Sequence, residues 1–352
     1  MYHKKIILNL FLFLIATFIS LVLVEFICRF FVKVPELKDR YYPLYENDKD
    51  LIWRLKKSFQ YEEVTLNSEG FRGNEPISND ERNFVILTIG DSNTFGLGVS
   101  DNMTYPAQLA TVIKRYTDRP VIVFNAGTPA FNLEQNLKLY ERISKNHKFD
   151  LVLLGIGIDD ILPPADFKVN DEGYLVARNQ SLPEHISRSP KIFMKRINYI
   201  LKKYSYFVRF FTSRFPGALT NLQIKLGLKK SSLDVYLSNW RDKHLINKGY
   251  QRIKNFRDLC KSRGSILILV IFTDPNQLLF NYGFNEYEQK LVTFCKGEGI
   301  LAVDLTEAYK PAFKEKGFLH LFIYNDGHPN KNGCRVIAEY ISNFITKNNL
   351  IK

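Results

Sequence analysis

The chain is poor in the residues that build zinc sites and disulfide frameworks. Only four cysteines occur among 352 residues, and their spacing fits no zinc pattern. We expect Cys260, Cys295 and Cys334 to be buried thiols, although one disulfide among them stays open if the domain lies outside the cytoplasm. Cys28 lies at the edge of an apolar segment, without the small residues that precede a lipoprotein cleavage site. Cysteine therefore indicates neither a metal site nor a dense disulfide scaffold.

Internal repeats, low-complexity segments and a phosphate-binding loop are also lacking. The short run 96–98 is rich in glycine, but it has neither the lysine nor the spacing of a phosphate cradle. Histidines and carboxylates do not cluster at metal-ligand spacing, so we predict no metal ion and no cofactor. A hydrophobic content of 45% with 24% charged residues is typical of a globular protein.

Basic residues outnumber acidic ones, which gives the chain a formal net charge of +13. Such a charge favours anionic lipid or anionic polymer as a partner, and by itself it does not exclude nucleic acid. A nucleic-acid binder is nevertheless disfavoured, because the chain has no recognition motif and carries a candidate membrane segment.

That segment lies near the N-terminus. Ile6–Ile27 is almost wholly apolar over 22 residues, with Glu25 as its only charge, and about 20 such residues span a bilayer as a helix. No small-residue cleavage site follows, which favours an uncleaved anchor over a signal peptide. Lys4 and Lys5 favour a cytoplasmic N-terminus, although basic residues also follow the segment. We therefore expect an anchor within residues 1–33 and an extracytoplasmic chain beyond it.

Short apolar runs alternate with helix-like stretches from residue 83 onward. Five runs are predicted as strands: Phe84–Ile89, Val121–Asn125, Leu151–Gly155, Ile266–Phe272 and Leu301–Asp304. Helices are predicted near Thr104–Tyr116, Leu133–Asn146, Lys248–Ser262, Tyr287–Glu298 and Gly333–Lys347. Continuous apolar strands are typical of a parallel sheet buried on both faces. The alternation predicts a three-layer α/β/α sandwich with a parallel sheet of about five strands.

Residues 34–82 precede this alternation and are polar and aromatic without a clear period. We expect them to form an extension that packs on the domain of residues 83–352. Within the extension, Phe59–Leu66 alternates weakly, as an edge strand would.

An insertion at about 165–245 interrupts the alternation. It opens with a predicted hairpin turn at 171–174 and then becomes basic and aromatic, with no Asp or Glu between His185 and Leu233. Over 191–203, apolar side chains at helical spacing with lysines on the other faces predict an amphipathic helix. Such a helix either lies on a membrane surface or packs its apolar side on the sandwich.

Gly90-Asp91-Ser92 directly follows the first predicted strand. A sharp strand-to-helix turn would put the Ser92 hydroxyl at the carboxyl end of the sheet, where open α/β folds bind ligands. The alternative is that Asp91 and Ser92 only cap a helix. Of the six histidines, only His328 has a fitting context, in a loop ahead of the last predicted helix. We predict Ser92 as nucleophile, His328 as base and Asp326 as the group that orients the imidazole.

The Gly90-Asp91-Ser92 block after a hydrophobic strand resembles the first block of the SGNH hydrolases, also called GDSL-type esterases and lipases. Further blocks follow in the family's order down to His328, and the N-terminal apolar segment is similar to that of a membrane-anchored bacterial branch. The resemblance implies the flavodoxin-like SGNH fold. The family's last block places Asp three residues before His, where this chain has Asn325, so Asn325 or another carboxylate could orient the histidine instead of Asp326.

The middle blocks imply which groups stabilise an oxyanion. The resemblance assigns this role to the backbone of Ser92 and Gly127 and, where the family has an asparagine side chain, to Asp159. An ionised carboxylate cannot donate a hydrogen bond. Either Asp159 is protonated, or Asn93, Asn132 or a backbone N–H replaces the missing donor, or the enzyme is slow. We expect Asn93 and Asn132 to lie at the substrate.

The resemblance implies a membrane-anchored, extracytoplasmic serine esterase or O-acyltransferase that forms an acyl-enzyme on Ser92. The acyl group would then pass to water or to a sugar hydroxyl. An acylated glycan or lipid of the cell envelope is the expected substrate, with the membrane as partner through the anchor and the basic insertion. The alternative is a weakly active or inactive protein of this fold that binds glycan, and Asp159 favours it.

Overall fold

The protein is described from a computed structural model. The structure describes residues 2–35, 42–75, 82–178, 193–215, 222, 226, 232–281 and 286–351. The first two residues of the predicted amphipathic run at 191–203 lie outside this set.

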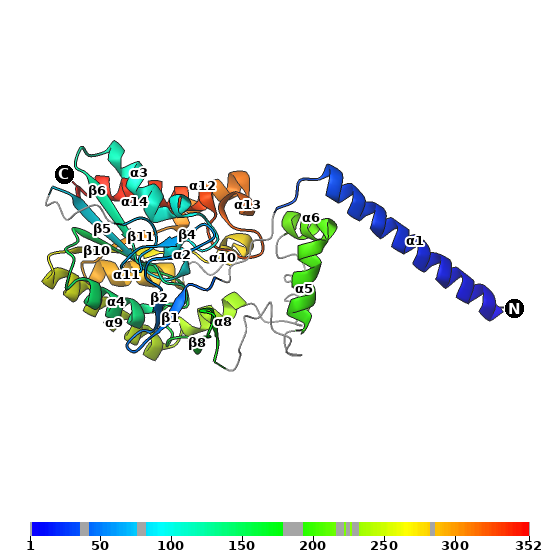
Figure 1. Ribbon diagram of the computed structural model, residues 1–352, viewed down its shortest axis with the longest axis horizontal. Helices are drawn as coiled ribbons and strands as arrows, with labels where there is room; N and C mark the ends of the chain where they lie inside the picture. The colour runs from blue at the N-terminus through cyan, green and yellow to red at the C-terminus, as the bar shows by residue number, and fades with distance from the viewer. Residues whose placement is uncertain are drawn as a thin grey trace.

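A five-stranded parallel sheet forms the centre of the molecule, in the order β11-β10-β7-β5-β6 (Figure 1). Its strands are β5 (Phe84–Ile89), β6 (Val121–Asn125), β7 (Leu151–Ile156), β10 (Ile266–Ile271) and β11 (Leu301–Asp304). The chain passes from β5 to β6 on one side and then crosses to β7 on the other. The strand order therefore reverses between β5 and β7, and doubly wound sheets bind their ligands at such a switch point.

Helices cover both faces of the sheet. One layer contains α4 (Leu133–Ile143), α8 (Ser232–Asn239), α9 (Lys243–Ser262) and α11 (Glu288–Gly297), and the other α3 (Tyr105–Val112), α12 (Thr306–Lys316) and α14 (Lys331–Lys347). Side chains of β7 alternate between the layers: Val152 and Leu154 pack in the first, Leu151 and Leu153 in the second. The predicted three-layer sandwich is confirmed.

Element boundaries differ from the predictions by small amounts. Strands β7 and β10 end within one residue of the expected positions. Helix α9 begins five residues early, because Asp242 caps it by accepting hydrogen bonds from the N–H groups of His244 and Leu245 at 2.8 and 3.2 Å. Elements that were not predicted include helix α12, α10 (Pro275–Phe280), α13 (Phe318–Leu321) and the 3₁₀ turn Asp101–Met103. The 3₁₀ turn Ile113–Arg115 falls within the predicted helix Thr104–Tyr116.

Two small hairpins precede the sandwich. They are β1 (Tyr45–Asp48) with β2 (Ile52–Leu55), and β3 (Phe59–Tyr61) with β4 (Val64–Leu66). The expected single strand over Phe59–Leu66 is wrong, because Glu62 takes a left-handed φ of 49° and turns the chain back on itself. The hairpins bury Trp53 against Phe131 of the domain.

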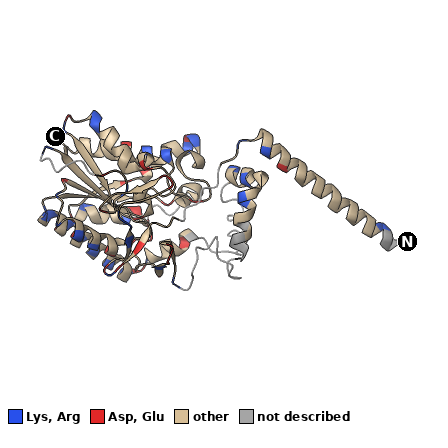
Figure 2. Cartoon of the chain, viewed as in Figure 1, with Lys and Arg blue, Asp and Glu red and all other residues tan. Residues whose placement is uncertain are grey.

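Helix α1 (Tyr2–Phe31) projects away from the sandwich (Figure 1). Its segment Lys5–Phe31 is long and apolar enough to cross a membrane. The insertion forms the predicted hairpin of β8 (Phe167–Val169) and β9 (Leu175–Ala177), and then two helices, α5 (Phe193–Tyr204) and α6 (Tyr206–Arg214). In Figure 1 these two helices lie between the sandwich and α1. Their sequences contain basic but no acidic residues, and Figure 2 shows basic residues on the parts that it colours.

All four cysteines are buried free thiols in this structure. The disulfide that the sequence leaves open is not formed.

Candidate active site

The turn after β5 places Ser92 at the first position of the short helix α2 (Ser92–Phe95). Gly90 has a φ of 158°, and a Cβ at this position would lie 2.5 Å from Thr94 Oγ1, so a side chain does not fit. The Asp91 carboxylate caps α2 by accepting a hydrogen bond from the Asn93 N–H at 2.9 Å. Both interpretations of the motif therefore hold: Asp91 caps a helix, and Ser92 sits at the carboxyl end of the sheet.

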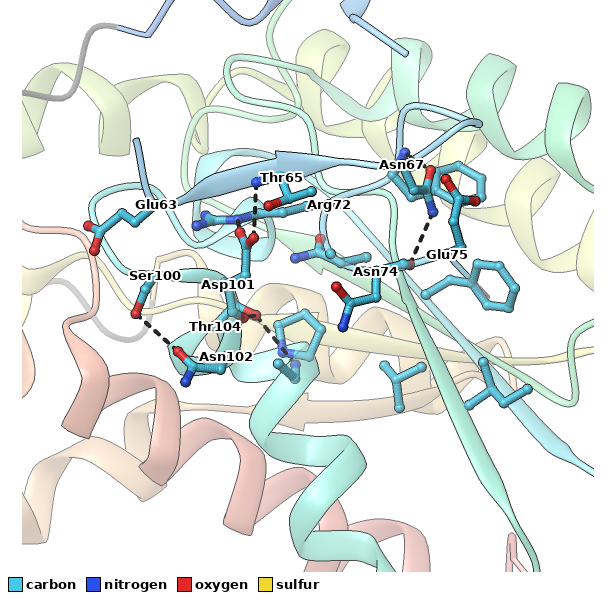
Figure 3. A pocket seen from close by; sticks show the side chains of 18 of the residues that line it. Glu63, Thr65, Asn67, Arg72, Asn74, Glu75, Ser100, Asp101, Asn102 and Thr104 are labelled. Atoms are coloured by element: carbon cyan, nitrogen blue, oxygen red, sulfur yellow. Dashed lines mark hydrogen bonds and ion pairs between the residues drawn. The ribbon is translucent and has the colours of Figure 1, made fainter. Parts of the chain in front are cut away.

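Arg72 holds the other end of α2. Its buried guanidinium donates to the carbonyl oxygens of Phe95 and Gly96 at 3.0 and 2.7 Å, and its Nε pairs with Asp101 Oδ1 at 2.8 Å (Figure 3). A cavity of about 660 Å³ opens beside this ion pair along β6, as Figure 3 shows. Ser92 does not line it, so the ion pair acts as a structural tie for the helix that carries Ser92.

The predicted catalytic side chains meet although 236 positions separate Ser92 from His328. His328 Nε2 lies 2.7 Å from Ser92 Oγ, and its Nδ1 contacts Asp326 Oδ1. A carboxylate accepts from the Nδ1–H, which leaves Nε2 free to accept from the serine hydroxyl. Asn325, the alternative orienting residue, has its side-chain oxygen on Lys202 Nζ at 2.5 Å. The arrangement can deprotonate a serine hydroxyl.

Three carboxyl groups, which we call the aspartate cluster (Asp91, Asp159 and Asp160), converge on Gly157. A Cβ built on Gly157 would lie 3.4 Å from Asp159 Oδ1 and 3.6 Å from Asp160 Oδ2 and Asp91 Oδ2. Asp160 accepts a hydrogen bond from the Gly157 N–H at 2.6 Å. Among the described residues, no group of His, Cys, Asp and Glu side chains, this cluster included, could hold a metal ion.

Burial raises the pKa values of the cluster, although the nearby charge of His328 opposes the shift for Asp91 and Asp159. Burial raises the pKa of Asp91 to about 6, with the negative charge of Asp159 adding to the effect. Burial and the two neighbouring carboxylates raise the pKa of Asp160 well above its ordinary value. The Asp159 side chain faces the cavity, where water reaches it, but protein surrounds it closely enough that desolvation raises its pKa as well. A neutral carboxyl group can donate a hydrogen bond, which an ionised one cannot.

The other predicted donors are hydrogen-bonded within the protein. The Gly127 N–H donates to Asn125 Oδ1 at 3.1 Å. A residue without a Cβ is needed at Gly127, where this loop lies against the backbone of Phe95. The Asn93 amide donates to Asp91 Oδ2 at 3.0 Å. Asn132 caps α4 and donates to the Leu162 carbonyl oxygen at 2.8 Å, so both ends of its amide are used. Both amides are therefore engaged within the protein, and the expected substrate contacts of Asn93 and Asn132 stay a prediction.

A cavity of about 560 Å³ contains Ser92 and Asp159 in its wall. Six aromatic residues also line it: Tyr42, Tyr45, Phe131, Phe167, Tyr174 and Tyr236. Tyr236 of α8 is a residue that the sequence reasoning missed, since an aromatic side chain in a helix is more often part of the core. Burial, followed by the charges of Asp159 and Asp274, raises its pKa and keeps the phenol protonated.

Comparisons with known proteins agree with this architecture. The family model described as GDSL-like Lipase/Acylhydrolase matches residues 86–341. No curated protein matches the chain. A catalytic mutant of the acetylxylan esterase Axe2 from Geobacillus stearothermophilus is 15% identical, with a TM-score of 0.44, covering 74% of this chain and 94% of that one.

Two further solved structures are similar at the same level. A member of the lipolytic protein G-D-S-L family from Veillonella parvula is 14% identical, with a TM-score of 0.42, covering 75% of this chain and 99% of that one. An alpha/beta hydrolase from the metagenome of Lake Arreo, Spain, is 16% identical, with a TM-score of 0.43, covering 76% of this chain and 97% of that one.

Proposed function

Because the chain belongs to the GDSL-like lipase and acylhydrolase family, we propose that it is a serine esterase or O-acyltransferase with Ser92 as its nucleophile. The observation that carries the proposal is the 2.7 Å contact between Ser92 Oγ and His328 Nε2, with Asp326 on the opposite ring nitrogen. A serine hydroxyl becomes a nucleophile when a base lies within hydrogen-bond reach and a third group orients that base.

In the acylation half, Ser92 Oγ attacks the ester carbonyl carbon while its proton moves to His328 Nε2. Asp326 stabilises the imidazolium that forms. His328 then gives this proton to the leaving alcohol oxygen as the ester C–O bond breaks, which leaves the acyl group on Ser92. In the second half, water or a sugar hydroxyl attacks the acyl carbonyl carbon while its proton moves to His328 Nε2. The bond between the acyl group and Ser92 Oγ then breaks, His328 returns the proton to Ser92 Oγ, and the acid or the acylated sugar is released.

The oxyanion of the tetrahedral intermediate needs donors, and we propose a protonated Asp159 together with the Ser92 backbone N–H. The raised pKa of Asp159 supports this assignment, since it enlarges the neutral fraction whose O–H can donate. The hydroxyl of Tyr236 in the same cavity wall is the alternative donor.

We further propose an acylated envelope glycan or lipid as substrate. The aromatic cavity wall supports this, because flat apolar ring faces suit a sugar ring or an acyl chain. Helix α1 would anchor the chain in a membrane, with residues beyond about 34 outside the cytoplasm and the basic helices α5 and α6 near the lipid surface.

The test is reaction of the purified full chain with a fluorophosphonate, which labels activated serines. Wild type should be labelled, and Ser92→Ala should not be. Ser100→Ala is the matched control: this serine lies in the loop after α2, and its hydroxyl donates to Asn102 Oδ1 at 3.1 Å. The proteins that are labelled should also hydrolyse p-nitrophenyl acetate, and Ser92→Ala should not.

A glycan-binding protein without turnover is the second candidate, and Asp159 at the position of the family asparagine is what favours it. If the wild type is folded and binds an acetylated oligosaccharide but is not labelled by the fluorophosphonate, this candidate would be established and the esterase refuted.

A further inference from the structure

The helices α5 and α6 contact both α1 and the loop that carries His328. At the α1 side, Glu25 binds the N-terminus of α6: its carboxylate accepts from the N–H groups of Tyr206 and Phe207 at 2.8 and 3.0 Å and from Ser205 Oγ at 2.8 Å. Arg29, one turn further along α1, lies 4.9 Å from the Tyr206 ring centroid. The single charge inside the apolar segment is therefore used to fix α6.

At the sandwich side, the same two helices contact the residues just before Asp326. Thr212 Oγ1 of α6 is hydrogen-bonded to the Tyr324 hydroxyl, and Lys202 Nζ of α5 donates to Asn325 Oδ1 at 2.5 Å. Both contacted residues lie within four positions of His328.

The loop turns sharply just before His328. Asn325 and Gly327 have φ values of 61° and 93°, a left-handed conformation that asparagine and glycine adopt most readily. The backbone bonds that close the turn are two long ones to the Ile323 carbonyl oxygen, from Asp326 and Gly327 at 3.3 and 3.2 Å, and one from the Ile323 N–H to the His328 carbonyl oxygen at 2.8 Å. Small displacements of His328 matter, since a misplacement of about 1 Å can cost on the order of 10²-fold in rate.

We propose that α5 and α6 form a clamp that positions the Asp326–His328 loop and ties its position to helix α1 through Glu25. Thr212 and Tyr324 are then positioning residues, which act on Ser92 only through His328. The expected effect on Ser92 rests on the esterase proposal, whereas the effect on loop mobility does not. An enzyme released from its anchor would keep the same side chains but lose part of this support.

The test compares Thr212→Val, Tyr324→Phe, their double variant, Thr212→Ser and Glu25→Ala in the full chain in detergent micelles. Two quantities are measured: the second-order rate of fluorophosphonate labelling, and hydrogen exchange of the 323–328 segment. Thr346→Val on α14 is the matched control, because Thr346 is also a half-buried helical threonine whose hydroxyl bonds the carbonyl four residues back.

Thr212→Val and Tyr324→Phe should each slow labelling on the order of 10-fold and speed loop exchange about 5-fold, the effect of losing one hydrogen bond. The double variant should equal either single one, because both lose the same bond. Thr212→Ser should restore both readouts. Glu25→Ala should speed exchange at the start of α6 and in the loop together.

The clamp would be overturned if hydrogen exchange of the 323–328 segment in every variant equalled that in Thr346→Val. It would also be overturned if Thr212→Ser were labelled by the fluorophosphonate as slowly as Thr212→Val. A wild type that is never labelled, with loop exchange still responding to Thr212→Val, would refute the esterase and support the clamp.

Discussion

Carboxyl groups at the carboxyl end of the sheet occur in two opposite settings. Asp326 lies against the His328 ring, which can carry a compensating positive charge. The aspartate cluster at Gly157 has hydrogen-bond donors that are neutral, the Asn93 amide and the Gly157 N–H. Asp326, Asp91 and Asp160 are largely removed from water, whereas the Asp159 side chain reaches water in the cavity. The two settings differ further in the partner of the carboxyl groups.

This difference assigns two roles to one type of side chain. A buried carboxylate with a cationic partner stays ionised and accepts hydrogen bonds, whereas one without such a partner takes up a proton. In the proposed mechanism Asp326 is the acceptor that orients a base, and a protonated Asp159 is the donor to developing negative charge. The predictions below change one setting at a time.

The largest effect is expected at the paired carboxylate. Asp326→Asn keeps the shape of the side chain but lets the wrong imidazole tautomer form, which should lower kcat on the order of 10³–10⁴-fold. Steady-state hydrolysis of p-nitrophenyl acetate measures it. Asp242→Asn, which preserves a helix cap remote from the cavity, should leave kcat unchanged. An Asp326→Asn variant of normal activity would transfer the orienting role to another residue.

At the unpaired setting the same type of substitution should act in the opposite direction. Asp159→Asn supplies a permanent donor, and since one such donor is worth on the order of 10²–10³-fold, we expect kcat to rise by about 10-fold or more. The gain should grow with pH, because the raised pKa of Asp159 makes wild type lose its donor as the carboxyl ionises. A pH series of kcat for both proteins tests this.

Tyr236→Phe distinguishes the two candidate donors. It should change kcat less than about 3-fold if Asp159 is the donor. A much larger loss, combined with no gain from Asp159→Asn, would assign the role to the phenol instead.

The smallest effect concerns stability. Protonation of Asp160 favours the folded state at low pH, and that contribution is lost as the pH rises through its raised pKa. Asp160→Asn removes the ionisation but keeps an oxygen to accept the Gly157 N–H. Its melting temperature should therefore exceed that of wild type at pH 8, by about 2–4 °C per kcal/mol, and much less at pH 4. Equal melting temperatures of wild type and Asp160→Asn at both pH 8 and pH 4 would contradict an uncompensated charge on Asp160.

Much of the fold was readable from the sequence because buried parallel strands appear as uninterrupted apolar runs. Val121–Asn125 was predicted to the residue. The meeting of Ser92 and His328 was also predictable, since both follow motifs that lie at one end of such a sheet.

The directions in which individual backbone and side-chain groups point could not be predicted from the sequence. A motif gives the position of Gly127 but not the direction of its N–H, which the backbone conformation sets and which here points at the Asn125 side-chain oxygen. Asn132 shows the same limit, although a clue was present: Gln135 three residues later completes a capping box. The contact between Glu25 and α6 joins segments about 180 positions apart, with no periodic pattern to announce it.

The close approach at Gly127 has a consequence for reading genetic variation in this protein. A Cβ there would lie 2.2 Å from the Phe95 backbone nitrogen and 2.6 Å from the Thr94 carbonyl carbon. Any missense change at this codon would push α2 out of place and abolish turnover as surely as loss of Ser92. An intolerant position in a mutational scan therefore need not be a reactive one.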